Sequence, residues 1–266
     1  MTKKNLSRFV PTVALANLAA GAHAWTALYT GGSISPDTGN SISAQTLFQT
    51  RQSGGAWFLD VVLTNTTSDA SGLKPADILT GLFWTLPAPA PLSPVSASLD
   101  VSVVWHSGSV VSGHPGNVGG EWAFRSGLAY QSSNGVYGVS ASGLGLFGPS
   151  DRFDTGQNLA GPVGVGGLEY GILPSLASWP TDANAPVVGN PLISSSVKFV
   201  FSTGSAELPA LPTTVWAQYG TSLSEPSLQL SGGLVQPQGV PVPEPFTMGL
   251  AGAALLFAAR RRSVRR

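Results

Sequence analysis

The chain has 266 residues, no cysteine, and 13 acidic residues against 13 basic ones. The absence of cysteine excludes disulfides, thiol catalysis and cysteine-ligated metal sites. Eight of the basic residues lie in the first eight and last seven positions, so residues 25–240 keep five basic against twelve acidic residues, a formal charge of −7. Such a body repels phosphate backbones and anionic lipid, which argues against nucleic-acid binding.

The N-terminus has the pattern of a secretory signal peptide. Three basic residues precede a mostly apolar stretch over residues 9–20, and an A-x-A cleavage site follows at Ala22 and Ala24. We predict that residues 1–24 form a signal helix, that the Sec translocon exports the chain, and that signal peptidase cuts after Ala24. Retention of this stretch as a membrane helix is the alternative.

Residues 25–236 are long enough for one domain with a sizeable core. The chain has 33 glycines and 21 prolines, and only 10% of its residues are charged, so long amphipathic helices have little to be built from. We therefore expect an all-β body, a single jelly-roll-like β-sandwich. The absence of a repeat of fixed period argues against a solenoid or a propeller.

In the first part of the body, residues 26–55 predict turns around short apolar pieces, with one strand over residues 44–49. Over residues 56–65, a strongly apolar set of side chains alternates with a more mixed set at a period of two, which predicts a strand with one face in the core. Pro75 favours a short helical turn, and residues 79–86 after it fit either a helix or a strand.

Farther along, residues 96–105 alternate again and predict one strand. Two strands over residues 121–130 and 135–142 are expected to form a hairpin, separated by residues 131–135, in which Asn134-Gly135 is the hairpin signal. Residues 143–190 show no clear period and predict a long ordered loop region. The last predicted strands cover residues 193–202, 213–220 and 227–231.

The last twenty-seven residues carry three unlike features in order. The first, Pro243-Glu244-Pro245, is extended, because proline fixes φ and lacks an N–H. Uncharged residues 246–259 follow, and as a helix they would reach about 21 Å, short of the roughly 30 Å hydrocarbon core. An arginine cluster beginning with Arg260-Arg261-Arg262 holds that end in the cytoplasm and places the body on the other side.

This order resembles the PEP-CTERM sorting signal of exosortase-dependent bacterial surface proteins. The resemblance implies that residues 237–266 are a sorting tail with a short transmembrane helix over residues 246–259. It also implies that a membrane-bound exosortase recognises Pro243, Glu244 and Pro245 and removes the tail. The precursor would then be anchored in the inner membrane, and its body would pass to the cell surface or extracellular matrix without a transmembrane helix. A plain C-terminal anchor is the alternative.

Four pieces of the body look like a recurrent domain of exosortase-dependent surface proteins called the XDD type. They are residues 77–84, 116–122, 143–148 and 218–226. That group has no established activity, so the resemblance implies a destination and a domain type without a mechanism.

Few residues of the body suggest chemistry, and we expect no catalytic residue, cofactor or metal. His106 and His114 are eight residues apart in a glycine-rich stretch, which matches no metal-ligand spacing. A concave site that held either histidine beside a carboxylate would favour a hydrolase. Residues 151–158 place side-chain oxygens around a glycine but lack the spacing of an EF-hand, so a surface turn is preferred to a calcium site.

Seven tryptophans offer rings that could stack on sugars. Five of them lie near predicted strands, where large aromatic residues fill cores: Trp57, Trp84, Trp105, Trp122 and Trp216. Trp179, in the predicted loop region, is the best candidate for an exposed ring. The sequence thus predicts a structural or adhesive surface protein, with an exopolysaccharide-binding module as the alternative and a secreted hydrolase as a third possibility.

Overall fold

The computed structural model describes residues 23–68, 72–154, 165, 167–175, 179, 182–208 and 210–235. Most of this part of the chain is in strands, which confirms the expected all-β body. The predicted signal helix up to Ala22 and the predicted sorting tail over residues 237–266 lie outside the described residues. Within the described ranges, no helix combines the length and the apolar character needed to cross a membrane.

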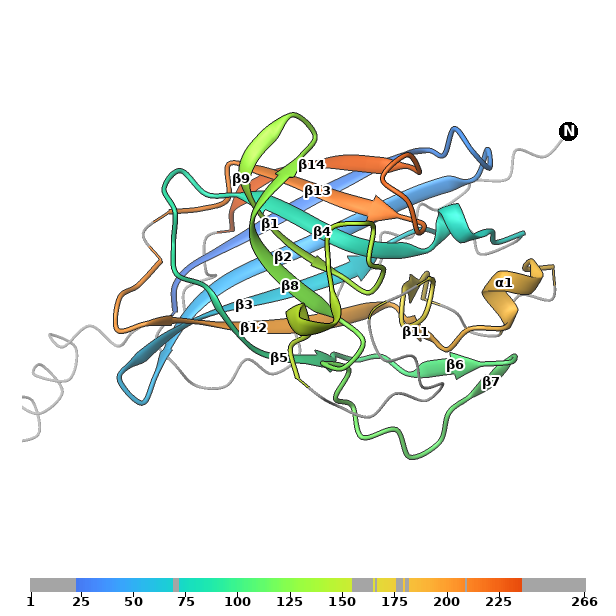
Figure 1. Ribbon diagram of the computed structural model, residues 1–266, viewed down its shortest axis with the longest axis horizontal. Coiled ribbons are helices and arrows are strands. Elements are labelled where there is room, and N and C mark those ends of the chain that lie inside the picture. Colours follow the sequence, from blue (N-terminus) through green and yellow to red (C-terminus); the bar gives the residue numbers. More distant parts are fainter. Residues whose placement is uncertain are drawn as a thin grey trace, which may run out of the picture.

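Fourteen strands form one large sheet (Figure 1). In chain order they are β1 (His23–Ile34), β2 (Ser41–Ser53), β3 (Ala56–Asn65), β4 (Leu79–Thr85), β5 (Ser93–Leu99), β6 (Val104–His106), β7 (Ser109–Val110), β8 (Ala123–Tyr130), β9 (Ser133–Ser140), β10 (Ile172–Leu173), β11 (Leu192–Ser194), β12 (Ser196–Gly204), β13 (Thr214–Tyr219) and β14 (Ser227–Leu234). The helices are single turns: η1 (Pro75–Asp77), η2 (Pro149–Asp151) and α1 (Ala185–Val188).

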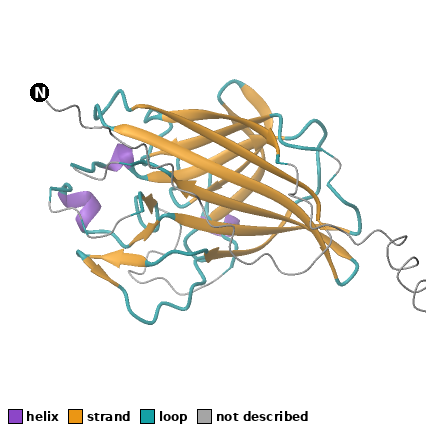
Figure 2. Ribbon diagram, turned by 180° about the vertical axis from the view of Figure 1, so that it is seen from behind, coloured by secondary structure: helices purple, strands orange, loops and turns teal. Residues whose placement is uncertain are grey.

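The strands follow the order β5, β12, β3, β2, β1, β14, β13, β4, β10, β11, β6, β7. The sheet branches at β4, because β9 pairs with β4 next to β10 and carries β8 on its other edge. Strand β14 joins the two halves, since residues 227–230 pair with β13 and residues 231–234 pair with β1. Figures 1 and 2 show the two halves lying one over the other.

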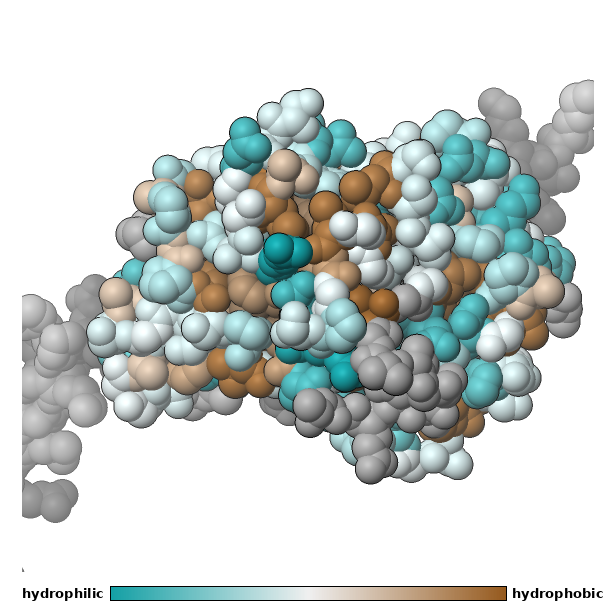
Figure 3. Space-filling view, viewed as in Figure 1, coloured by the Kyte–Doolittle hydropathy of each residue, from teal (hydrophilic) through white to brown (hydrophobic). Residues whose placement is uncertain are grey.

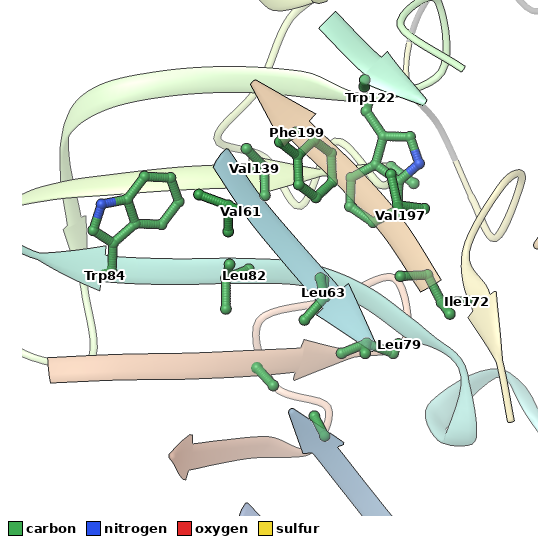
Figure 4. Packing of buried hydrophobic residues seen from close by; sticks show 14 of the residues in the cluster. Val61, Leu63, Leu79, Leu82, Trp84, Trp122, Val139, Ile172, Val197 and Phe199 are labelled. Atoms are coloured by element: carbon green, nitrogen blue, oxygen red, sulfur yellow. The ribbon is translucent and has the colours of Figure 1, made fainter. Parts of the chain in front are cut away.

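Aromatic rings fill the space between the two halves. Trp84 of β4 contacts Phe48 of β2 and Phe201 of β12, with ring centroids 5.8 and 5.9 Å apart. Trp122 packs edge-on against Phe199 of β12 at 5.0 Å (Figure 4). Each such ring buries about 150–250 Å². In a chain without disulfides, this core is what holds the two halves together.

Strand β4 is buried on both faces, because Trp84 points into this core and Phe83 points the other way. There the β8–β9 hairpin covers Phe83, whose ring stacks on Tyr130 at 3.8 Å. Hydrophobic residues reach the surface near the middle of this side (Figure 3). Burial on both faces removes the alternation that marks a strand, which is why residues 79–86 were ambiguous. The predicted helical turn is also present, as η1.

Strand β1 corrects the prediction that turns dominate residues 26–55. It has twelve residues and pairs with β2 along most of its length. Ala27 and Tyr29 are buried, but glycines and polar residues around them hide the alternation in the sequence. The partner strand, rather than the local pattern, makes this segment a strand.

Three other predictions of strand boundaries are wrong. The predicted strand over residues 96–105 ends at Leu99, and its Val101 is 72% exposed. The turn of the β8–β9 hairpin lies at Gln131 and Ser132, both with positive φ, within the predicted connection over residues 131–135. Strand β9 begins earlier than predicted, at Ser133, so that Asn134-Gly135 falls inside it. Residues 193–202 are divided into β11 and β12 at Ser195, whose φ is 76°. In each case a left-handed residue or a bend ends the strand.

Candidate functional site

The residues of the predicted sorting motif, Pro243, Glu244 and Pro245, lie outside the described residues, as do Arg260, Arg261 and Arg262. Of the predicted signal cleavage site, Ala22 lies outside them, and Ala24 belongs to the backbone of β1. The predicted cleavage point after Ala24 therefore falls inside the first strand. The structure offers a different group of residues for examination as a site.

Glu121 is the most unusual of the buried polar side chains. It is 2% exposed, and its Oε1 has no hydrogen-bond partner among the described residues. It lies in a turn before β8, where its backbone N–H donates to the carbonyl of Val118 at 3.0 Å. Burial of a carboxyl group without such partners is costly, which makes this position worth explaining.

Residues 152–154 run alongside this turn and bring two more charged side chains to it. The Arg152 guanidinium donates from Nη1 to the carbonyl of Gly120 at 3.1 Å. The carboxyl group of Asp154 lies against Gly119, where an added Cβ would come within 2.7 Å of it. A glycine at position 119 therefore allows Asp154 to approach the turn that carries Glu121.

Glu169 supplies a further carboxyl group of the site. The N–H of Tyr170 donates to the carbonyl of Pro191 at 2.7 Å, which holds Glu169 next to the start of β11. Strand β11 pairs with β6, which ends at His106. The Oε2 of Glu169 is also buried without a hydrogen-bond partner in the described part of the chain. We call Glu121, Arg152, Glu169 and His106 the Glu121 cluster.

The charges of this cluster act on one another. Burial, and after it the negative charge of Glu169, raise the pKa of Glu121 to about 7, although Arg152 opposes the increase. Burial also raises the pKa of Glu169, and His106 partly offsets that increase. Perturbed carboxyl groups that influence one another are typical of functional sites, although ion-pair networks produce them too.

His114 is the second histidine of the body, and it lies eight residues after His106. The ring of His114 is 6.1 Å from that of Tyr170, the residue after Glu169, and its Nδ1 accepts from the N–H of Gly116 at 3.1 Å. Burial lowers the pKa of His114. Both histidines that the sequence singled out thus lie near residues 169–170. Within the described ranges, no three His, Asp or Glu side chains are grouped as a metal site would require.

The acids of residues 151–158 do not converge as a calcium loop would require. The Oδ2 of Asp151 accepts from the N–H of Gly148 at 2.7 Å and caps η2. The Oδ2 of Asp154 accepts from the side-chain amide of Asn117 at 2.8 Å. The remaining residues of this predicted turn, 155–158, lie outside the described residues.

A separate group of charges stabilises one face of the sheet. Asp60 of β3 is buried and binds Arg51 of β2 at 3.0 Å and Lys198 of β12 at 2.9 Å. The Arg51 guanidinium also lies 4.6 Å from the ring centroid of Phe58. Because both cations are committed to Asp60 across three neighbouring strands, we interpret this group as structural.

The tryptophans divide into buried and half-buried rings. Trp84, Trp122 and Trp216 are buried, as predicted. Trp57 and Trp105 are only half-buried, which corrects that prediction for these two. Trp179 is half-buried and packs against Trp105, with ring centroids 5.7 Å apart. The ring expected to be most exposed is therefore partly covered by a neighbour from β6.

No family model, curated protein or solved structure matches this chain. A function must therefore be inferred from the chain's own residues. The resemblance of four pieces of the body, residues 77–84, 116–122, 143–148 and 218–226, to the XDD type stays a prediction. One of them, residues 116–122, contains Glu121.

Sequence reasoning missed the Glu121 cluster. Glu121 and Glu169 are 48 positions apart, and their charges interact only because residues 168–171 lie beside β11 and the turn before β8 packs onto the same core. The one available signal was local: Glu121 follows two glycines and precedes Trp122, which is buried in the core. That pattern suggests a buried acid but does not identify its partner.

Proposed function

We propose that this protein is an exported surface or extracellular-matrix protein, structural or adhesive rather than catalytic. Its partners in export are the Sec translocon and signal peptidase. An exosortase then sorts it through Pro243-Glu244-Pro245, and the anchored precursor becomes a protein of the cell surface or matrix. Its body is a single β-sandwich of the jelly-roll kind.

The observation that carries this proposal is that the chain enters and leaves the body at one place. The N–H of Val235 donates to the carbonyl of Thr26 at 2.9 Å, and β1 pairs with β14 from Ala27 to Thr30. Both predicted membrane signals flank this point in the sequence. A body whose two ends are adjacent can fold while both signals hold it at one membrane surface.

The Glu121 cluster lies toward the other end of the same strands. Thr26 is in register with Gln49 at the entry end, whereas Gly31 is in register with Ala44, which pairs with Asn65. The side-chain amide of Asn65 donates to the carbonyl of Ile172 in β10 at 2.9 Å. Five residues of strand correspond to about 17 Å. A body tethered at Thr26 and Val235 would therefore present the cluster away from the membrane.

Intact-mass measurement of the protein from its native host, with and without the exosortase, tests the proposal. We expect a product that begins at Trp25 and lacks the arginine cluster when the exosortase is present, and a product that keeps the tail through Arg266 when it is absent. Glu244→Gln should block removal of the tail, and Gln236→Ala should not. A full tail at steady state in the wild-type host would establish a plain anchored protein instead.

The Trp105–Trp179 pair supports a second candidate function, binding of exopolysaccharide. Half-buried rings can stack on sugar faces while their edges remain packed. Co-sedimentation with the host's exopolysaccharide should be lost in Trp179→Ala and kept in Trp57→Ala, a half-buried tryptophan on β3. Equal binding by both variants would exclude this surface as the sugar site.

The effect of His106 on the pKa of Glu169 supports the third candidate, a secreted hydrolase, because a carboxylate can orient a histidine that acts as a general base. Assays with model esters and with the host's exopolysaccharide as substrates test it. Turnover that is lost in His106→Ala and retained in His114→Ala would favour the hydrolase over a structural role.

A further inference from the structure

The β8–β9 hairpin carries an asparagine, Asn134, whose side chain is exposed and makes no hydrogen bond within the described part of the chain. Each of the other five asparagines that the structure describes has a side-chain hydrogen bond: Asn40, Asn65, Asn117, Asn184 and Asn190. Asn134 is therefore the one described asparagine whose side chain turns about χ1 and χ2 without giving up a hydrogen bond.

The backbone at Asn134 is irregular as well. The register of the hairpin shifts here, so that two residues of β9 lie opposite one residue of β8, as in a β-bulge. The two residues are Asn134 and Gly135, and both are exposed. Gly135 has a φ of 70°, and a Cβ added to it would meet nothing within 4 Å. Because Gly135 has no side chain, its backbone nitrogen is not screened from the side chain of Asn134.

We propose that Asn134 is a site of spontaneous deamidation, in which the backbone nitrogen of Gly135 attacks the side-chain carbonyl carbon of Asn134 and forms a succinimide ring. The proposal goes beyond the sorting function and does not depend on it. The nitrogen of Gly135 loses its proton to solvent as its bond to Cγ forms. The bond between Cγ and Nδ2 then breaks, and Nδ2 takes up a proton and leaves as ammonia. Both reacting groups belong to adjacent residues, so the step needs no second molecule.

Water completes the reaction by opening the ring at one of its two carbonyl carbons. Hydrolysis at Cγ gives aspartate, whereas hydrolysis at the backbone carbonyl carbon gives isoaspartate, in which the main chain runs through the former side chain. The balance is the same in both cases, because water is consumed, ammonia is released and a carboxylate replaces the amide. Arg125 is the only charged residue in the sequence from 123 to 140, so the reaction takes the hairpin from a formal charge of +1 to zero.

Peptide mapping of the full chain, purified in mild detergent and incubated in neutral buffer, tests the proposal. Trypsin releases residues 126–152, a peptide in which Asn134 is the only asparagine. We expect this peptide to convert with time into two products, each heavier by the difference between an oxygen atom and an NH group. Chromatography separates them as the aspartate and isoaspartate forms. After incubation in water enriched in oxygen-18, each product should carry a single labelled oxygen from that water.

Three controls accompany this measurement. A synthetic peptide of residues 126–152, incubated beside the full chain, gives the time over which the sequence reacts without the fold. We expect the folded chain to react within about tenfold of the peptide's rate, because no hydrogen bond of the Asn134 side chain must break first. Asn134→Gln, which would have to form a larger ring, should give no product over this time. Asn117, whose amide makes two hydrogen bonds, should stay intact in the same digest.

Near-ultraviolet circular dichroism verifies that the incubated chain is folded. An intact Asn134 in the folded chain, at a time when the synthetic peptide has been converted, would overturn the proposal, because the fold would then protect this residue. Aspartate as the sole product would also overturn it, since direct hydrolysis of the side-chain amide forms no succinimide and therefore no isoaspartate. Conversion of Asn117 as fast as Asn134 would show that the unbonded side chain does not select the site.

Discussion

Gly138 of β9 lies directly against the ring of Phe83 of β4. A Cβ at position 138 would come within 2.8 Å of both Cδ1 and Cε1 of that ring, and within 3.0 Å of Leu128 Cδ1. Phe83 also stacks on Tyr130. The ring therefore contacts both a neighbouring backbone and a second ring, and the β8–β9 hairpin can close over β4 without displacing the ring only if position 138 has no side chain.

Gly138→Ala should destabilise the fold by about 1–3 kcal/mol, because the added methyl group overpacks this contact. Urea unfolding of the purified protein measures the change. The control is Gly233→Ala in β14, where an added Cβ meets nothing within 4 Å. We expect the control to change the free energy of unfolding by less than about 0.5 kcal/mol. Equal effects of the two variants would contradict the packing described for Phe83.

The buried carboxyl group of Glu121 should make stability depend on pH. Its folded-state pKa of about 7 exceeds the ordinary 4.5, so as pH rises between these values the unfolded chain loses its proton first. The folded state then binds more protons, and the free energy of unfolding falls with rising pH, by up to about 3 kcal/mol. This decrease in the free energy of unfolding is complete once the pH is above the folded-state pKa of Glu121.

Urea unfolding from about pH 5 to about pH 8 measures this dependence. Glu121→Gln should flatten it and should be more stable than the wild type at the alkaline end. Glu207→Gln, which changes an exposed acid, should keep the wild-type slope. A wild-type stability that rises over this interval, with the same rise in Glu121→Gln, would show that Glu121 does not titrate as described.

Asp60→Asn should cost more stability than Lys198→Met. Asp60 holds two cations, so its loss leaves both Arg51 and Lys198 without a partner, whereas loss of Lys198 leaves Asp60 paired with Arg51. Because both cations are partly exposed, solvent limits the cost to about 1–3 kcal/mol for Asp60→Asn and under about 1 kcal/mol for Lys198→Met. Chemical denaturation measures the free energy of unfolding of the two variants. A larger loss in Lys198→Met than in Asp60→Asn would exclude the central role of Asp60.

Gln218 organises the turn between β13 and β14. Its fully buried amide donates from Nε2 to the carbonyls of Tyr219 and Glu225 at 2.8 and 3.1 Å, and its Oε1 accepts from Tyr130 at 2.7 Å. Gln218→Leu should cost about 1–3 kcal/mol, because buried polar groups lose their partners. Gln229→Leu, at an exposed position on β14, is the control for urea unfolding. A neutral Gln218→Leu would refute this role.

The sequence predicted the strands whose alternation reflects burial on one face. Residues 56–65 match β3 in extent, because Leu59, Val61 and Leu63 lie on the core face. The residues between them lie on the opposite face, where Asp60 is buried by its ion pairs and Val62 is partly exposed. The absence of cysteine and the scarcity of charge also indicated an all-β body held by apolar packing. These features depend on local composition and period, which a single segment carries by itself.

The tertiary structure decided what depends on distant partners. Strand β1 exists because β2 and β14 pair with it, and β4 was ambiguous because it is buried on both sides. The charge of Glu169 acts on Glu121 only after residues far apart in the chain are folded together. Pairing and charge coupling are properties of neighbours in space, so no local pattern in this sequence could specify them, whereas strand period and composition were already present in it.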